Sequence, residues 1–322
     1  MASLYRNMLW FAKGMKEYSR GGFQSACRSF DLLDLDVDCT GKVFMVTGAT
    51  GTLGRVVVME LAKKGGIVHV VCQHKDRGES LKELVAAATS KECIYIHVVD
   101  LSSVQEAASF AKSFANTHSA LNVLVNCVSA MSEDREIGAD GIEKTFATNT
   151  LGLHLLISNL VPLLNESYEP RVVIVTCGCL LMHKLNPTDL QFEQMFPYDG
   201  VAAFAQTKRQ QVVMTEHYAE AYPGIHFSAM HPGWLEPNGV KAVVPKVLGK
   251  INVSCRTVEE AVDTVLWLAI SRAALKHSSG MFFQDRKTTC PHLPLGKTKT
   301  SLEDEKYFMR RLHDFVKGLN LE

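Results

Sequence analysis

The chain has 322 residues, 47% of them hydrophobic and 21% charged, and its 34 basic residues balance its 34 acidic residues. These are ordinary values for a globular protein with a sizeable core, and a balanced chain without a basic tract gives no electrostatic reason to expect nucleic-acid binding. The nine cysteines are scattered from Cys27 to Cys290, several in apolar runs, which is typical of reduced, buried thiols in an intracellular protein and not of a disulfide framework.

The first thirty residues predict an amphipathic helix, and we expect residues 1–40 to form an N-terminal helical extension. Five cations stand here against a single acid, Glu17. Apolar residues recur at spacings of three and four, which places on one helical face Leu4, Met8, Phe11, Met15 and Tyr18. Two interpretations stay open: a helix of residues 1–30 that contacts a membrane surface or targets the chain, and a helix that packs on the domain or on a second subunit. No stretch of the chain approaches the apolar length of a membrane-spanning helix.

From residue 41 onward, short apolar runs alternate with helical patterns. Strands are expected at 43–46, 67–72, 94–99, 121–126, 171–176, 225–230 and 281–283, and helices at 55–64, 80–90, 104–114, 142–164, 202–222 and 258–270. This alternation predicts parallel strands joined by right-handed crossovers. We therefore expect a single-domain α/β fold over residues 41–290, with a Rossmann-type doubly wound parallel sheet in three α/β/α layers. Residues 291–322 are a charged tail that predicts a peripheral helix.

A glycine-rich segment stands between the first strand and the first helix of this series. Glycines in that position allow a tight turn and close backbone approach to a pyrophosphate, which lies on the helix N-terminus. The alternative is a glycine turn that holds no ligand. The predicted cofactor-binding residues here are Thr47, Gly48, Gly51, Leu53, Gly54 and Arg55.

The end of the second strand bears on the choice of cofactor. An NAD site usually carries an acid there for the ribose 2′-hydroxyl, but this chain has Cys72-Gln73-His74-Lys75. Because the acid is missing and cations stand near, the sequence favours NADP over NAD.

The order of the elements, together with several motifs, resembles the short-chain dehydrogenase/reductase family over about residues 40–285, and within it the retinol-dehydrogenase-like branch. The motifs that carry the likeness are Leu4-Tyr5-Arg6, Trp10-Phe11-Ala12-Lys13-Gly14, Lys208-Arg209-Gln210-Gln211-Val212-Val213, His231-Pro232-Gly233-Trp234 and Gly280-Met281-Phe282-Phe283-Gln284-Asp285-Arg286-Lys287.

The resemblance implies roles for residues at matching positions. Asp100 matches the acid that contacts the adenine ring, and Asn126 ends the fourth strand among the cofactor-binding residues. Asn149 matches the asparagine that holds a proton-relay water. Lys208 matches the lysine that binds the nicotinamide ribose, and Pro232-Gly233 matches the turn beside the nicotinamide.

The departures from the family pattern fall at the catalytic positions. Phe204 stands where the family has its catalytic tyrosine, four residues before Lys208, and Thr176-Cys177 replaces the family serine. General acid catalysis is typically worth about 10²–10⁴-fold, so loss of the phenol predicts weak carbonyl reduction at best. The catalytic set implied by the resemblance is Asn149, Thr176, Cys177, Phe204 and Lys208.

Two other side chains are candidate substitute acids. Tyr198 lies in the loop that enters the helix of Lys208, and Cys177 is a weak donor. His183 and His231 are more typical of loop and turn residues, and Cys177-Gly178-Cys179 supplies too few ligands for a structural zinc site, so no metal is expected.

Two long loops, 180–200 and 234–254, are rich in apolar residues. They predict a small apolar substrate, a carbonyl compound or an alcohol, although the same residues could equally pack down on the core. Three functions stay open: a weak NAD(P)-dependent oxidoreductase, a nucleotide-binding pseudoenzyme with a sensing or partner-binding role, and a fold kept for assembly alone. By analogy with the family, the helices 142–164 and 202–222 are candidates for a homodimer interface.

Overall fold

A computed structural model describes residues 2–235, 253–319 and 321 of the chain. One sheet organises them, with the strand order β3-β2-β1-β4-β5-β6-β7-β8. All neighbouring strands run parallel except β8, which pairs antiparallel with β7. The strands are β1 (Val43–Thr47), β2 (Ile67–Cys72), β3 (Ile94–Val98), β4 (Val123–Asn126), β5 (Arg171–Val175), β6 (His226–Met230), β7 (Met281–Gln284) and β8 (Lys287–Thr288).

Both faces of the sheet are buried, so its central strands are apolar throughout. Successive side chains of a strand point to opposite faces. Accordingly, Phe44 and Val46 of β1 join one core cluster while Met45 joins the other, and in β5 Val173 and Ile174 divide in the same way.

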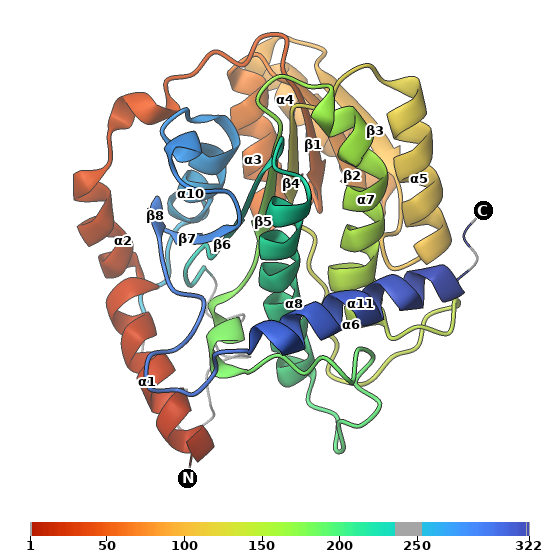
Figure 1. Ribbon diagram of the computed structural model, residues 1–322. Helices are drawn as coiled ribbons and strands as arrows, with labels where there is room; N and C mark the ends of the chain where they lie inside the picture. The colour runs from red at the N-terminus through yellow and green to blue at the C-terminus, as the bar shows by residue number, and fades with distance from the viewer. Residues whose placement is uncertain (1, 236–252, 320, 322) are drawn as a thin grey trace.

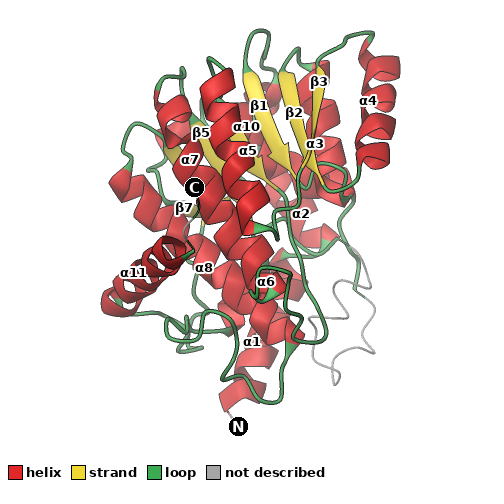
Figure 2. Cartoon of the chain, turned by 90° about the vertical axis from the view of Figure 1, so that its right-hand side faces the viewer, coloured by secondary structure: helices red, strands yellow, loops and turns green. Residues whose placement is uncertain are grey.

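Two sets of helices cover the two faces of the sheet (Figures 1 and 2). The first set is α3 (Thr52–Lys63), α4 (Lys75–Thr89) and α10 (Val258–Ile270), and the second is α5 (Val104–Thr117), α7 (Gly152–Asn165) and α8 (Gly200–Ala221). The predicted three-layer, doubly wound α/β/α domain is therefore confirmed. Helix starts were less accurate: α3 begins at Thr52 and α4 at Lys75, three and five residues before the predicted starts at Arg55 and Ser80.

The helical segment predicted at 142–164 has a more complex form. It consists of α6 (Lys144–Phe146), a π-helical turn η3 (Ala147–Leu151) and α7. Contrary to the sequence expectation, the span Lys144–Asn165 is long and apolar enough to cross a membrane. However, 83% of its most apolar window is buried inside the fold, so this segment serves as a core helix.

The N-terminal extension forms α1 (Ala2–Glu17) and α2 (Arg20–Ala26), which lie along the outer side of β7 and β8 (Figure 1). The buried face of the extension agrees only in part with the predicted one. Phe11 and Tyr18 are buried as predicted, and Trp10 is buried as well, whereas Leu4 and Met8 remain more than half exposed. A side chain at Gly14 would collide with the Trp234 ring, because an added Cβ would lie 2.2 Å from it. The extension therefore packs on the domain along one face and leaves the other face to solvent.

The C-terminal tail contains α11 (Leu302–Gly318), which crosses the outer side of α8 and α7 (Figure 1). It buries Phe308, Met309 and Leu312. A groove of about 850 Å³ runs between α7, α8 and α11, and none of the predicted site residues lines it. The homodimer through the two long helices stays a prediction.

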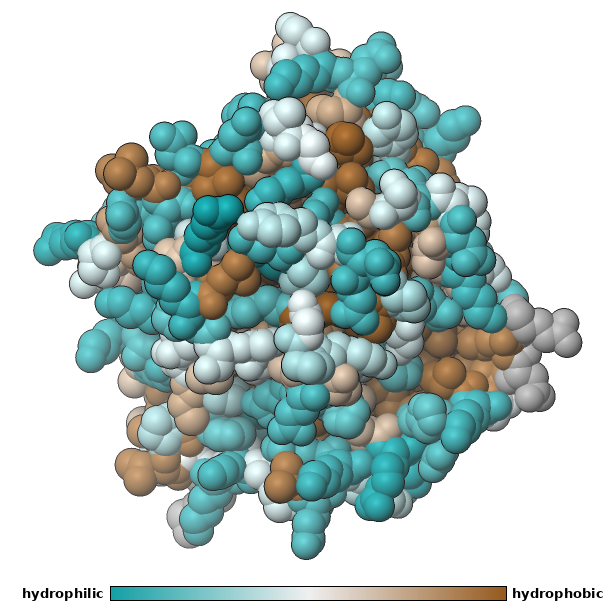
Figure 3. Space-filling view, turned by 45° about the horizontal axis from the view of Figure 1, so that its top comes forward, coloured by the Kyte–Doolittle hydropathy of each residue, from teal (hydrophilic) through white to brown (hydrophobic). Residues whose placement is uncertain are grey.

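The end of the molecule where the strands begin is at the top of Figure 1. Its surface is mainly hydrophilic with scattered apolar side chains, and a larger apolar area lies at the right-hand edge (Figure 3). Single exposed apolar residues are ordinary on a protein surface. The arrowheads of β1 and β2 point to the opposite end, where α1 lies (Figure 2).

Candidate active site

The order of the strands reverses between β1 and β4, and the glycine turn Gly48–Gly51 lies at that point. In open α/β sheets, ligands bind outside the carboxyl ends of the strands where the order reverses. The turn leads into α3, whose N-cap Gly51 provides no side-chain hydrogen bond and whose first turn contains no acid. The N-terminal backbone amides of α3 therefore keep their positive end available to an anion.

The glycines of this turn are required by close packing. Gly48 has a positive φ of +60°, and a Cβ added to it would lie 2.8 Å from the Val128 backbone. A Cβ on Gly54 would lie 2.3 Å from the Gly48 carbonyl oxygen. Leu53 packs at the edge of the core, and Arg55 is exposed on the first turn of the helix. The geometry fits a pyrophosphate against the turn and the helix N-terminus.

Thr47 and Asn126 connect the carboxyl ends of β1 and β4. The Thr47 hydroxyl donates to Asn126 Oδ1 at 2.6 Å, and both residues are fully buried. Among the residues that the structure describes, the buried Asn126 Nδ2 amide has no hydrogen-bond partner. A buried donor of this kind is rare and suits a site that acquires its acceptor from a ligand.

Asp100 lies beside the end of β2, and its contact with the adenine ring stays a prediction. Its carboxylate accepts hydrogen bonds from Gln73 Nε2 at 2.9 Å and from the Ser102 backbone and hydroxyl at 2.8 Å. These hydrogen bonds lower the pKa of Asp100 against the opposing effect of burial, which is the largest single influence on it. Gln73 thus takes the position of the acid that an NAD site carries, and the neighbouring Lys75 and Arg77 are exposed.

Asn149 lies within the π-helical turn η3 and is fully buried. Its side chain accepts a hydrogen bond from Ala130 N–H at 2.8 Å and donates to the Ala130 carbonyl and to the Thr207 hydroxyl. Its backbone carbonyl accepts from Gln211 Nε2 at 2.7 Å. The structure thus makes Asn149 a clamp between the loop after β4 and helix α8.

Lys208 lies one turn after Phe204 on α8 and is 1% exposed. Its ammonium is 5.3 Å from the centre of the Phe204 ring and donates to the Val175 carbonyl at 3.4 Å. Burial lowers the pKa of Lys208 to about 8, although the neighbouring thiols of Cys177, Cys179 and Cys127 oppose this shift. The phenyl ring of Phe204 lies beside the lysine, but it has no hydroxyl group that could donate a proton.

The two residues that replace the family serine point in different directions. Thr176 is buried, and its hydroxyl donates to the Met230 carbonyl of β6 at 2.8 Å. Cys177 is only half-buried and begins the 3-10 turn η4 (Gly178–Met182). Of the two, Cys177 is the residue that can face a substrate.

The Pro232-Gly233 turn is fixed by the buried Arg256. Gly233 has φ +84°, and an added Cβ would lie 2.2 Å from the arginine. Arg256 forms two hydrogen bonds with the Asp285 carboxylate at 2.6 and 2.9 Å and donates to the Pro232 carbonyl at 3.4 Å.

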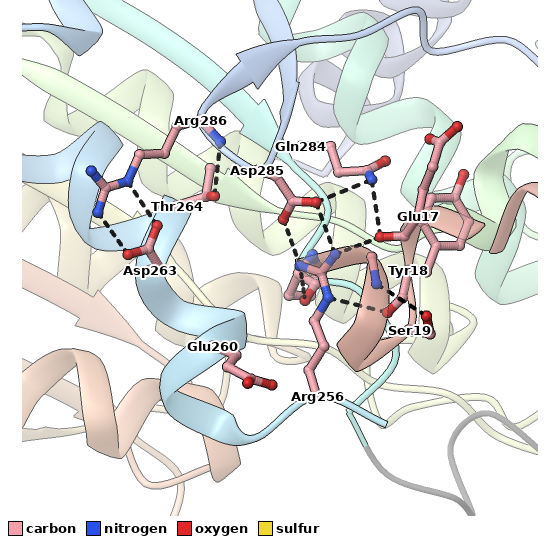
Figure 4. A network of polar contacts seen from close by, with 12 residues as sticks. Glu17, Tyr18, Ser19, Arg256, Glu260, Asp263, Thr264, Gln284, Asp285 and Arg286 are labelled. Carbon is pink, nitrogen blue, oxygen red and sulfur yellow. Dashed lines mark hydrogen bonds and ion pairs between the residues drawn. The ribbon is translucent and has the colours of Figure 1, made fainter. Parts of the chain in front are cut away.

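The same arginine also holds the N-terminal extension (Figure 4). Its guanidinium donates to the Glu17 carbonyl at 2.6 Å and to the Tyr18 carbonyl at 3.1 Å. Trp234 N–H also donates to the Tyr18 carbonyl, at 2.8 Å. The extension is therefore part of the wall of the site. Local sequence patterns do not indicate this role, because the contacts join positions more than 200 residues apart.

Neither Tyr198 nor the two histidines of these loops supplies the missing general acid. The Tyr198 hydroxyl donates to Glu143 at 3.3 Å, at the start of α6. His231 is buried, and its Nδ1 accepts from Gly178 N–H at 3.0 Å. Burial lowers the pKa of His231 to about 3 and that of His183 to about 4, so both imidazoles are neutral at pH 7.

The first predicted substrate loop packs down on the core. Its buried apolar residues include Leu180, Leu181, Met182, Leu185, Leu190 and Phe192. This packing agrees with the alternative that these residues serve the core. Most of the second loop, 236–252, lies outside the described residues. Within the part of the chain that the structure describes, no group of three His, Cys, Asp or Glu residues could hold a metal ion.

Taken together, the sheet order, the glycine turn and the lysine on α8 define a dinucleotide-binding α/β protein. Comparison with known proteins gives the family. The family model for short chain dehydrogenases matches residues 42–184. Dehydrogenase/reductase SDR family member 12 from Homo sapiens is 42% identical over 98% of both chains, and retinol dehydrogenase 12 from Bos taurus is 29% identical over 86% of this chain and 85% of its own.

Solved structures share the fold at low sequence identity. The short-chain dehydrogenase from Shigella flexneri has a TM-score of 0.62 at 16% identity and covers 83% of this chain and 98% of its own. A short-chain dehydrogenase from Escherichia coli complexed with NADPH has a TM-score of 0.61 at 17% identity, with 78% and 99% covered. The chain belongs to the short-chain dehydrogenase/reductase family.

Proposed function

We propose that the protein binds NADP at the carboxyl edge of its sheet and acts as a slow oxidoreductase on small apolar carbonyl compounds or alcohols. The observation that carries this proposal is that the predicted nucleotide-binding residues are present while the catalytic tyrosine is replaced by phenylalanine. The glycine turn, Asn126 and Lys208 are in place, whereas Phe204 stands against Lys208 where the family has tyrosine.

The cofactor, when bound, supplies or accepts the hydride. The chain's own residues would do the rest. The turn 48–51 and the N-terminus of α3 would hold the pyrophosphate, and Asp100 would contact the adenosine. Lys208 would bind the nicotinamide ribose, while Gly233, held by Arg256, would allow the close approach of the ring. Cys177, which follows β5 where the family has its serine, would be a polar side chain beside the substrate oxygen.

NADP is preferred over NAD in this proposal because Gln73 replaces the acid that would bind a ribose 2′-hydroxyl. An acid there would repel a 2′-phosphate, whereas the exposed cations Arg55, Lys75 and Arg77 attract it. The solved relative from Escherichia coli is complexed with NADPH, which agrees with this preference. The apolar substrate class rests on the likeness to retinol dehydrogenases.

A second candidate function is a nucleotide-binding pseudoenzyme, and the ring of Phe204 favours it. The test is the variant Phe204→Tyr, in which the ammonium of Lys208 would lower the pKa of the new phenol. We expect carbonyl reductase activity to rise by at least about tenfold, a lower bound set beneath the range of about 10²–10⁴-fold for general acid catalysis. The matched control is Phe110→Tyr, at a partly buried phenylalanine on α5 outside the site, which should leave the reductase activity unchanged. If Phe204→Tyr binds NADPH but gains no activity toward apolar aldehydes and ketones, the oxidoreductase proposal fails and the pseudoenzyme stands.

A further inference from the structure

Three thiols surround the buried ammonium of Lys208, and only one of them suits nucleophilic attack. Cys179 is fully buried, and burial raises its pKa. Burial also raises the pKa of Cys127 to about 12. Cys177 is less buried than Cys179, its pKa is lowered instead of raised, and it lies two residues after the end of β5.

The surroundings of the Cys177 sulfur favour its thiolate form. The sulfur accepts the Cys179 backbone N–H at 3.5 Å. Hydrogen bonding by the Cys179 thiol is the largest influence on the pKa of Cys177 and lowers it. Burial opposes this shift, whereas the Cys179 backbone N–H and Lys208 lower the pKa further. Thiolates next to a lysine and a backbone amide are typical of reactive cysteines, since the thiolate is the nucleophile.

Two buried hydrogen-bond donors without acceptors lie next to the turn η4, which follows Cys177. Because His231 Nδ1 accepts from Gly178 N–H and the ring is neutral, its proton is on Nε2. His231 Nε2 has no hydrogen-bond partner among the described residues, nor does the Tyr18 hydroxyl, and both residues are at least 98% buried.

These two donors lie close to one another and to the thiol. The rings of Tyr18 and His231 meet edge to face with their centres 4.4 Å apart. The His231 ring lies against Gly178, where an added Cβ would be 2.7 Å from Nε2. Cys177 and Cys179 are near enough to Tyr18 to raise the pKa of its phenol, after the larger effects of burial and Glu17. A buried unpaired donor is costly, so this arrangement suits a ligand that brings an oxygen acceptor.

We propose that Cys177 is a covalent capture site for apolar aldehydes. The sulfur bonds to the carbonyl carbon, the carbon–oxygen π bond breaks, and the thiol proton ends on the carbonyl oxygen, which gives a neutral hemithioacetal. Tyr18 and His231 donate to that oxygen. No oxidant or cofactor takes part in this addition. The inference deepens the proposed function, because it names the substrate class of the same site.

The first test measures labelling of each cysteine by iodoacetamide, with peptide mass spectrometry, in wild-type protein at pH 7. Exposure alone would make the exposed Cys290 the faster of the two. We expect Cys177 instead to label about tenfold faster than Cys290, as a lowered pKa implies. Octanal should slow Cys177 alone, and octanol, which has no carbonyl carbon, should not. Slower labelling of Cys177 than of Cys290, or equal protection by octanal and octanol, would overturn the proposal.

The second test uses octanal labelled with carbon-13 at its carbonyl carbon, followed by NMR. The protein should produce a signal for a carbon bonded to oxygen and sulfur, which Cys177→Ser loses and the control Cys290→Ser keeps. Tyr18→Phe removes one donor, so its adduct should be about fivefold weaker, the size of a typical hydrogen bond. A signal that persists in Cys177→Ser would contradict the assignment.

Because the adduct needs no cofactor, the two proposals fail separately. NADPH binding without an adduct would leave the proposed function standing and remove the covalent site. An adduct without NADPH binding would support the covalent site and contradict the proposed NADP-dependent function.

Discussion

The burial of Lys208 makes a quantitative prediction for the variant Lys208→Met. Burial lowers the pKa of this lysine from 10.5 to about 8. At roughly 1.4 kcal/mol per pH unit, the folded state at pH 7 carries an electrostatic cost of about 3 kcal/mol for keeping the amine charged. Methionine fills a similar volume without a charge. We therefore expect Lys208→Met to raise the free energy of unfolding at pH 7 by about 1–3 kcal/mol, although it removes a ribose-binding residue.

The stability of the wild-type protein should depend on pH because the pKa of Lys208 differs between the folded and unfolded states. The folded pKa lies below the unfolded pKa, so between about pH 8 and 10.5 the unfolded state binds more protons, and stability rises with pH. The cost is thus fully present below pH 8 and disappears as the pH rises toward 10.5. The stability gap between the variant and the wild type should shrink across that window.

Urea unfolding at pH 7 and at pH 10, followed by far-UV circular dichroism, measures this gap. The matched control is Lys63→Met on α3, an exposed lysine paired with Glu60, which should change stability by less than about 0.5 kcal/mol at either pH. If Lys208→Met is less stable than the wild type at pH 7, or if its gap does not depend on pH, then Lys208 is not a buried, strained cation.

Two further predictions concern the N-terminal extension. Arg256→Met should lower the free energy of unfolding by about 3–5 kcal/mol in urea titrations, because it leaves the buried Asp285 carboxylate without its partner. The control is Arg272→Met, at an exposed ion pair. Equal effects of the two substitutions would refute the role of Arg256. Liposome flotation tests the membrane-contact prediction: the exposed Leu4 and Met8 on a cation-rich helix should carry the protein to vesicles of anionic lipid. The double variant Leu4→Ser/Met8→Ser should not float, whereas the control Leu84→Ser should; if wild-type protein stays with the unbound fraction, that prediction is wrong.

The sheet could be predicted from the sequence because its signals are local. Runs such as Val43–Val46 and Arg171–Val175 are continuous apolar strands between helical patterns, and the glycine turn stands in its expected place after the first strand. The starts of α3 and α4 were placed too late, because their first turns are polar and lack the apolar period. The motif positions Asp100, Asn149 and Lys208 also follow from local sequence.

The wall of the site could not be predicted in this way. Arg256 contacts Tyr18, Pro232 and Asp285, which are brought together only by the complete fold. The spacing of apolar residues in the N-terminal extension predicted the burial of Phe11 and Tyr18 correctly. It failed at Leu4 and Met8, which are exposed, and it did not indicate the contact of Trp10 and Gly14 with the domain. One signal was available: the Gly14 that interrupts an otherwise helical pattern suggests close packing at that point.

The proposed function requires a functional nucleotide site at the carboxyl edge of the sheet. The direct measurement is a titration of the purified protein with NADPH and NADH, following energy transfer from tryptophan; Trp10 and Trp234 pack against each other beside the site, with ring centres 5.6 Å apart. We predict micromolar binding that is tighter for NADPH than for NADH and is lost in Lys208→Met. Failure to bind either dinucleotide would contradict the account and would reduce the glycine turn and Lys208 to structural roles.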